Sequence, residues 1–106
     1  MFLRKYNTAI FIHGCFWHQH RGCRYAYTPK SRQDFWEKKF QRNICRDREV
    51  RRKLEETHIK CLIIWECAVR KMRKDETYRQ KVLLETECFL NSNQPYMEIQ
   101  PEKMEK

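Results

Sequence analysis

The chain has 106 residues, enough for one domain with a modest hydrophobic core. Lys and Arg number 23 against 14 Asp and Glu, so the formal net charge of +9 weakly favours a polyanionic partner such as nucleic acid. No apolar stretch could span a bilayer and no signal peptide begins the chain, so we expect a cytoplasmic protein without a membrane segment. The six cysteines are then better explained as metal ligands or free thiols than as a disulfide framework.

Two short apolar stretches, residues 8–12 and 61–65, are predicted to be buried strands. A long helical segment between them is expected to begin after Ser31, its predicted N-cap. A strand, a helix and a second strand in this order are usually joined by a right-handed crossover. It makes the strands parallel and brings their carboxyl ends to one edge of the sheet. We therefore predict an α/β fold in which His13 and Cys67 are neighbours.

A further helix is predicted from Asp75 to Leu90, because the polar run 91–95 that follows it is typical of a loop. The domain is accordingly predicted to cover residues 1–92. We expect residues 93–106 to form a polar C-terminal tail that is frayed after Pro101.

The run 13–23 combines three imidazoles, two thiols and two large aromatic side chains. Closely spaced Cys and His side chains are natural zinc ligands. Cys67, delivered by the second strand end, would complete a four-coordinate site with Cys15, His20 and Cys23. An ordinary buried thiol is the alternative for Cys67, but zinc explains why two thiols and a histidine share one loop. The spacing therefore predicts a structural zinc site.

The two other histidines of this run can move protons. His13 stands where a core strand meets a glycine, a usual place for an active-site residue in an open sheet, whereas His18 could also be a spare metal ligand. Asp47 lies about 20° from Trp36 on a helical projection, within the apolar stripe of the predicted helix. A carboxylate there needs a cation, a hydrogen-bond donor such as histidine, or water. A buried Asp–Arg pair is the structural alternative.

Phe16 and Trp17 are adjacent aromatic residues in the same run. Rigid side chains of this kind can wedge between stacked bases. They can equally cap a hydrophobic core, which is the commoner role of aromatic residues. Composition and spacing leave both interpretations open.

Three strings carry a family resemblance: FIHGCFWHQHRGCRYAYTPKSRQDFW, RNICRDREVRRKL and LIIWEC. They resemble the very short patch repair endonucleases, the Vsr-type enzymes that nick double-stranded DNA at thymine–guanine mismatches. The resemblance runs from about Tyr6 to Leu90. It implies a restriction-endonuclease-like α/β core with a strand–helix–strand crossover, a C-terminal helix and a structural zinc. It also implies a magnesium-dependent centre that hydrolyses the phosphodiester 5′ to the mismatched thymine, in a protein that we expect to be a monomer.

The resemblance also implies roles for individual residues. The zinc ligands would be Cys15, His20, Cys23 and Cys67. The catalytic set would be His13, His18 and Asp47, with His18 as the general base or water-activating group. The aromatic residues inserted beside the mismatch would be Phe16, Trp17 and Trp36. The resemblance thus favours the wedge interpretation.

Two departures from the family pattern bear on catalysis. The family carries a Pro-Asp pair just before the first core strand, and this aspartate is its principal magnesium ligand. By alignment it would fall immediately ahead of Met1, so the predicted domain lacks the family's amino-terminal part. Ile12 stands where a threonine usually precedes the HGC motif. We therefore expect an impaired nicking endonuclease, and the alternative is a zinc-stabilised DNA-binding remnant without catalysis.

Overall fold

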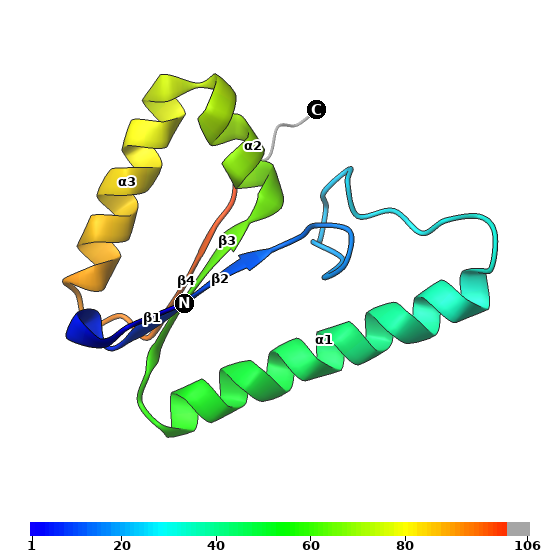
Figure 1. Cartoon of the computed structure of the whole chain (residues 1–106), viewed down its shortest axis with the longest axis horizontal. Coiled ribbons are helices and arrows are strands. Elements are labelled where there is room, and N and C mark those ends of the chain that lie inside the picture. The colour runs from blue at the N-terminus through cyan, green and yellow to red at the C-terminus, as the bar shows by residue number, and fades with distance from the viewer. Residues whose placement is uncertain (102–106) are drawn as a thin grey trace.

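The computed structural model describes residues 1–101. In chain order the elements are β1 (Phe2–Leu3), a short 3-10 helix η1 (Arg4–Tyr6), β2 (Thr8–His13), α1 (Gln33–Glu56), β3 (Lys60–Trp65), α2 (Glu66–Lys74), α3 (Glu76–Leu90) and β4 (Tyr96–Ile99). Figure 1 shows the sheet between α1 on one side and the α2–α3 pair on the other. The fold is therefore of the α/β class, as the sequence predicts.

The strands form one sheet in the order β1-β2-β3-β4. The central strands β2 and β3 are parallel and pair His13 with Trp65 at their carboxyl ends, while β1 is antiparallel to β2. The two predicted strands and their parallel pairing are confirmed. The end of β2 and the start of α2, which directly follows β3, consequently lie at the same edge of the sheet.

The larger of two buried hydrophobic clusters lies on the α2–α3 face, and the smaller, around Ile63 and Trp65, lies on the α1 face. Side chains alternate between the two faces of a strand, so one set of β3 and β4 residues points toward the helices. Five buried residues make up the larger cluster: Leu62, Ala68, Val82, Phe89 and Ile99. Because α2 begins directly after β3, the chain turns back over the sheet without a loop, and α3 completes the apolar layer.

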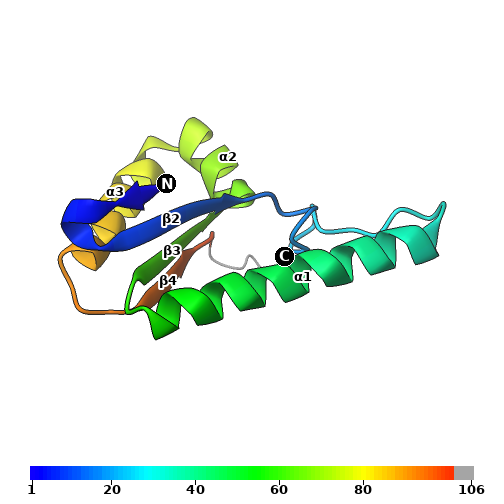
Figure 2. The same ribbon diagram turned by 60° about the horizontal axis from the view of Figure 1, so that its bottom comes forward.

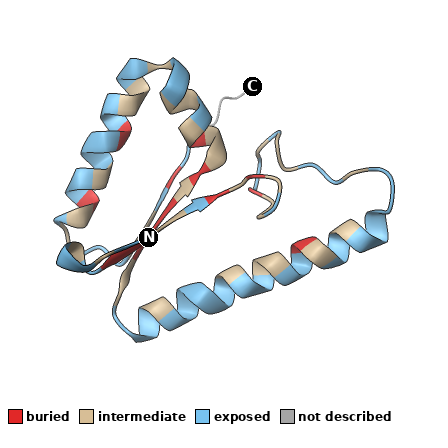
Figure 3. Cartoon of the chain, viewed as in Figure 1, coloured by how far each residue is buried: buried red, intermediate tan, exposed pale blue. Residues whose placement is uncertain are grey.

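Helix α1 is long and mostly exposed to solvent. Figure 2 shows it running beneath the sheet and past the strand ends, and Figure 3 shows that little of its surface is buried. Its apolar stripe is only partly covered: Phe40 is buried, whereas Val50 is exposed. The prediction of Ser31 as N-cap is wrong, because the N-cap is Arg32 with φ 57° and no side-chain capping bond. Within residues 1–101, no helix is long and apolar enough to cross a membrane.

The C-terminal segment corrects the predicted boundary at residue 92. Residues 96–99 form β4, which is parallel to β3 and pairs Cys61 with Tyr96. This strand was missed because it is short and follows a polar run. In a strand, however, Met97 and Ile99 point toward the apolar core while Tyr96 and Glu98 point toward α1. The folded unit therefore extends beyond residue 92, and the predicted fraying after Pro101 lies outside the described residues.

Candidate metal centre and histidine–aspartate cluster

The structure brings together the four predicted zinc ligands. Cys15, His20 and Cys23 lie in the loop after β2, and Cys67 lies at the start of α2; their donor atoms are all within 4.8 Å of one another. The His20 Nδ1 atom is 3.6 Å from the Cys15 Sγ and 3.5 Å from the Cys67 Sγ. A tetrahedral zinc ion with ordinary bond lengths places sulfur and nitrogen ligands about 3.6 Å apart. The donor set and its spacing therefore fit zinc.

Neighbouring side chains orient this cluster. The His20 Nε2 donates a hydrogen bond to the Gln100 Oε1 at 2.5 Å, which leaves Nδ1 free as an acceptor toward the thiols. The Glu66 carboxylate accepts a hydrogen bond from the Cys15 backbone N–H at 3.3 Å. A histidine whose second nitrogen is held in this way is typical of metal sites.

The thiols of the cluster are close together, with Cys15 buried and Cys23 and Cys67 half-buried. Burial raises the pKa of Cys15. Burial and the neighbouring Cys15 and Cys23 thiols raise the pKa of Cys67 to about 12. Thiolates at this spacing need a cation between them, and a bound zinc ion would replace their protons. These residues would then tie the loop after β2 to the end of β3.

The second cluster contains His13, His18 and Asp47. The His18 Nδ1 donates a hydrogen bond to the Asp47 Oδ2 at 2.6 Å, so the carboxylate on the α1 stripe has a histidine partner. The His13 ring stacks on His18 with a centroid separation of 3.9 Å and an interplanar angle of 6°. His18 and Asp47 keep side-chain exposures of 25% and 30%. The pair is thus ordered by neighbours and still accessible to water.

His13 is the inner member of this cluster. Burial is the main cause that lowers its pKa, and the adjacent His18 lowers it further. Its Nδ1 atom is buried and has no hydrogen-bond partner among residues 1–101. Burial and the neighbouring His18 therefore favour the neutral form of the His13 ring, which stacks on His18.

Trp65 lies between the two clusters. Its indole stacks on His20 at 4.0 Å and 6°, and contacts His13 edge to face at 5.2 Å and 83°. The indole Nε1 donates a hydrogen bond to the Glu98 Oε1 at 2.9 Å. Burial alone would raise the pKa of Glu98, but hydrogen bonds from Tyr96 and Trp65 outweigh it and the pKa is lowered. Glu98 was not identified from the sequence. The alternation of polar and apolar residues in Tyr-Met-Glu-Ile could have indicated the strand that carries it.

The three predicted DNA-inserting aromatics also meet. The Phe16 ring lies 5.1 Å from Trp17 and 5.5 Å from Trp36 between centroids. It also contacts the buried Phe40 at 5.2 Å, whereas Trp17 is 47% exposed. Phe16 thus anchors the cluster on α1, while Trp17 presents an aromatic surface to solvent. Tyr27, 5.2 Å from Phe16, extends this cluster and was not predicted.

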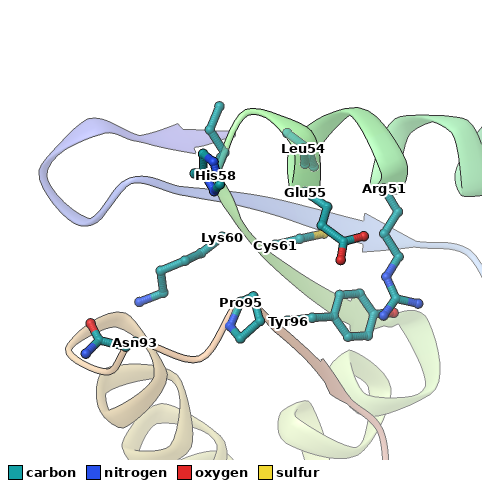
Figure 4. Close-up of a pocket in the computed structure, with 10 residues that line it drawn as sticks. Arg51, Leu54, Glu55, His58, Lys60, Cys61, Asn93, Pro95 and Tyr96 are labelled. Atoms are coloured by element: carbon teal, nitrogen blue, oxygen red, sulfur yellow. The ribbon is translucent and has the colours of Figure 1, made fainter.

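A hollow of about 420 Å³ lies away from both clusters, between the end of α1 and the starts of β3 and β4. Figure 4 shows its lining, with the Arg51 guanidinium beside the Tyr96 ring. None of its lining residues belongs to the Cys–His or His–Asp cluster. The Cys–His and His–Asp clusters therefore lie outside this hollow.

Comparison with known proteins gives matches within one family. The family model described as "DNA mismatch endonuclease Vsr" matches residues 1–24. The DNA mismatch endonuclease Vsr of Escherichia coli strain K12 is 40% identical over 80 residues, which are 74% of this chain and 51% of the relative. The Type II nicking enzyme V.NmeAIP of Neisseria meningitidis is 43% identical over 68 residues, which are 64% of this chain and 48% of the relative.

A third relative is the Type II nicking enzyme V.XorIIP of Xanthomonas oryzae. It is 39% identical over 61 residues, which are 58% of this chain and 44% of the relative. The chain thus spans about half the length of the curated relatives it matches. Over that half, the resemblance drawn from the sequence strings is confirmed, and the chain is related to the Vsr DNA mismatch endonucleases.

Proposed function

We propose that the chain is the core of a Vsr-type strand-nicking endonuclease that recognises thymine–guanine mismatches in double-stranded DNA. The observation that carries this proposal is the accessible His18–Asp47 pair beside a Cys–His cluster with zinc geometry, in a chain related to nicking enzymes. The α/β architecture supports a restriction-endonuclease-like core. The reaction would hydrolyse the phosphodiester 5′ to the mismatched thymine.

Helix α1 supplies the DNA-contacting surface in this proposal. Its exposed side chains include Lys38, Arg42, Arg46, Arg48 and Lys53. Cations along one exposed helix contact phosphates and position a duplex without reading its sequence. Phe16, Trp17 and Trp36, near the beginning of the same helix, would wedge beside the mismatch.

His18 is the group suited to activate water. An ionised carboxylate can only accept hydrogen bonds, so Asp47 fixes the proton of His18 on Nδ1 and leaves the lone pair on Nε2. Nε2 can then take a proton from the attacking water, while the carboxylate stabilises the imidazolium that forms. His13, stacked behind the ring, limits its rotation.

The described residues do not form a magnesium site by themselves. Magnesium prefers several oxygen ligands. In the His13–His18–Asp47 cluster, only Asp47 offers oxygen, and it already accepts the bond from His18. The metal in such nucleases neutralises the scissile phosphate and the leaving oxygen. We therefore propose that the 106-residue chain nicks slowly.

The backbone pairing of Met1 with Ile10 supports a position for a further carboxylate in this proposal. Met1 and Ile10 exchange backbone hydrogen bonds at 2.7 and 3.1 Å, next to the Phe2–Ala9 pair. Continuing this antiparallel register, a residue placed immediately before Met1 would lie opposite Phe11. Since residues two apart on a strand share a face, its side chain would lie on the same face as His13.

A nicking assay tests the proposal. Three zinc-loaded proteins are compared with magnesium on a T:G duplex and on the matched T:A duplex: the chain itself, the chain with Pro-Asp added before Met1, and the chain with Pro-Asn added. We expect slow T:G nicking by the chain, faster nicking with Pro-Asp, and no gain with Pro-Asn. Light scattering is expected to show a monomer of 13.3 kDa.

The alternative function is a zinc-stabilised DNA-binding protein without catalysis. The single available carboxylate of the His–Asp cluster favours it. Preferential binding of the T:G duplex with no nicking by any of the three proteins would establish this alternative. Equal binding of both duplexes would overturn mismatch recognition in either form.

A further inference from the structure

Glu98 is an exposed residue of the edge strand β4, and both of its carboxylate oxygens accept hydrogen bonds from side chains. One carboxylate oxygen accepts the indole N–H of Trp65 at 2.9 Å, and the other accepts the hydroxyl of Tyr96. Trp65 is only 8% exposed, and a buried indole N–H needs an acceptor. Glu98 provides that acceptor from the neighbouring strand.

The orientation of the Trp65 indole affects both clusters. One face covers His20, whose Nδ1 points at the thiols, and the His13 ring packs against the indole in an edge-to-face contact. His18 lies 6.4 Å away at an interplanar angle of 77°. If the indole rotated about its χ2, it would lose both the stack on His20 and the edge-to-face contact with His13.

We propose that Glu98 is a positioning residue: by fixing the indole of Trp65, it holds the stacked His13 and His18 rings in the orientation in which His18 bonds Asp47. This inference rests on the proposed function for the reaction that is positioned. Its geometry rests only on contacts among described side chains.

A purely structural role would be to fasten β4 to β3. The two roles differ in what they require of residue 98. Fastening the strands uses backbone pairing and the bulk of the side chain, whereas positioning requires an acceptor for the indole N–H. Glu98→Gln keeps an acceptor, while Glu98→Leu keeps approximate size and removes it.

The test uses the zinc-loaded full chain and the NMR signals of its side chains. The histidine ring signals and the indole N–H signals are recorded for wild type, Glu98→Leu, Glu98→Gln and Trp65→Phe. We expect Glu98→Leu and Trp65→Phe to shift the His13 and His18 ring signals and Glu98→Gln to leave them nearly unchanged. Glu98→Leu should also make the Trp65 indole N–H exchange faster with solvent than in the wild type, because its hydrogen-bond acceptor is lost.

Tyr96→Phe is the matched control, because it removes the other donor to Glu98 without touching the Trp65 bond. It should leave the His13 and His18 signals in place. The double variant Glu98→Leu with Trp65→Phe should resemble Trp65→Phe alone, because without the indole N–H the Glu98 carboxylate has no Trp65 donor to hold. Unmoved His13 and His18 signals in a folded Glu98→Leu protein would overturn the proposal, and so would equal shifts in Glu98→Gln.

Nicking provides a second readout. Glu98→Leu is expected to lower kcat about 10-fold to 100-fold, with unchanged affinity for the T:G duplex, as for other residues that orient a site from outside it. If wild type does not nick, the proposed catalytic function fails, while the histidine signals still decide the role of Glu98. Shifted histidine signals with unchanged kcat would count against positioning.

Discussion

The α2–α3 face of the sheet is packed with apolar side chains, whereas the α1 face carries thiols, imidazoles and carboxylates. On the first face, Leu62, Val82 and Phe89 are almost fully buried. On the second, α1 is largely exposed and the loop 14–32 has no regular helix or strand. The comparison indicates that one face is stabilised by hydrophobic burial, whereas the other combines a second buried cluster around Ile63 and Trp65 with polar contacts. The proposed zinc ion would add to the order of this second face.

Removing zinc is expected to have the largest effect, and to disorder the α1 face far more than the α2–α3 face. Structural zinc sites contribute apparent binding free energies on the order of 10 kcal/mol at neutral pH. Chelation, or the substitution Cys67→Ser, is expected to release the loop 14–32 and α1, while α3 stays protected. Hydrogen exchange of the backbone amides measures both regions. Cys45→Ser and Cys88→Ser, at exposed thiols, are the controls. Purified protein without bound zinc would contradict the expectation.

Truncating the apolar core should affect the opposite face. Phe89 is 2% exposed, and Phe89→Ala is expected to lower the free energy of unfolding by about 3–5 kcal/mol. Leu84, on the same helix and 63% exposed, is the matched control, with a change within about 0.5 kcal/mol. Urea denaturation of the zinc-loaded protein measures both. A weaker zinc affinity in folded Phe89→Ala would show that the two faces are coupled.

Lys60 connects the start of β3 to the end of α3. Its Nζ donates hydrogen bonds to the carbonyl oxygens of Phe89, Leu90 and Ser92 at 2.7, 3.1 and 2.8 Å. Lys60→Met removes these charged donors and is expected to lower the free energy of unfolding by about 1–3 kcal/mol. Lys81→Met, at an exposed position of α3, should change it little. Equal denaturation midpoints for the two variants would exclude this capping role.

Of these variants, Asp47→Asn is expected to change the free energy of unfolding least. Its main effect is expected on the rate of nicking. The His18–Asp47 pair is partly exposed to solvent, so its loss is expected to cost less than about 1 kcal/mol. An amide no longer fixes the His18 proton on Nδ1, and nicking of the T:G duplex is expected to fall about 10²-fold to 10⁴-fold. Asp34→Asn, in the first turn of α1, is the control. If Asp47→Asn melts at the same temperature as the wild type and nicks the T:G duplex at the same rate, Asp47 has no part in the proposed mechanism.

Much of the α/β core was predictable because its signals are local. The β-branched runs at 8–12 and 61–65 gave strands, and their connection by one helix gave the parallel pairing. The same topology placed the end of β2 next to the segment that carries Cys67. The N-cap was less predictable, since Arg32 takes a left-handed conformation without a capping side chain.

The candidate site was predictable only in part. Cys15, His20 and Cys23 are close in sequence, so a metal ligand set was visible, and Asp47 was conspicuous on an apolar stripe. Glu98 and Gln100 were not, because each acts through a hydrogen bond to a residue far away in the chain. A polar residue after a loop carries no sign of its partner until the strand that bears it is placed.

The sequence by itself determined which donor atoms the chain possesses, the period of its central elements and the family that its strings resemble. Tertiary structure decided that Asp47 meets His18, that Trp65 separates the two clusters and that β4 supplies Glu98 to the indole. The reason is physical. Periodicity and ligand spacing are local properties, whereas a hydrogen bond or ring stack between distant segments depends on the register of the sheet and the path of α1.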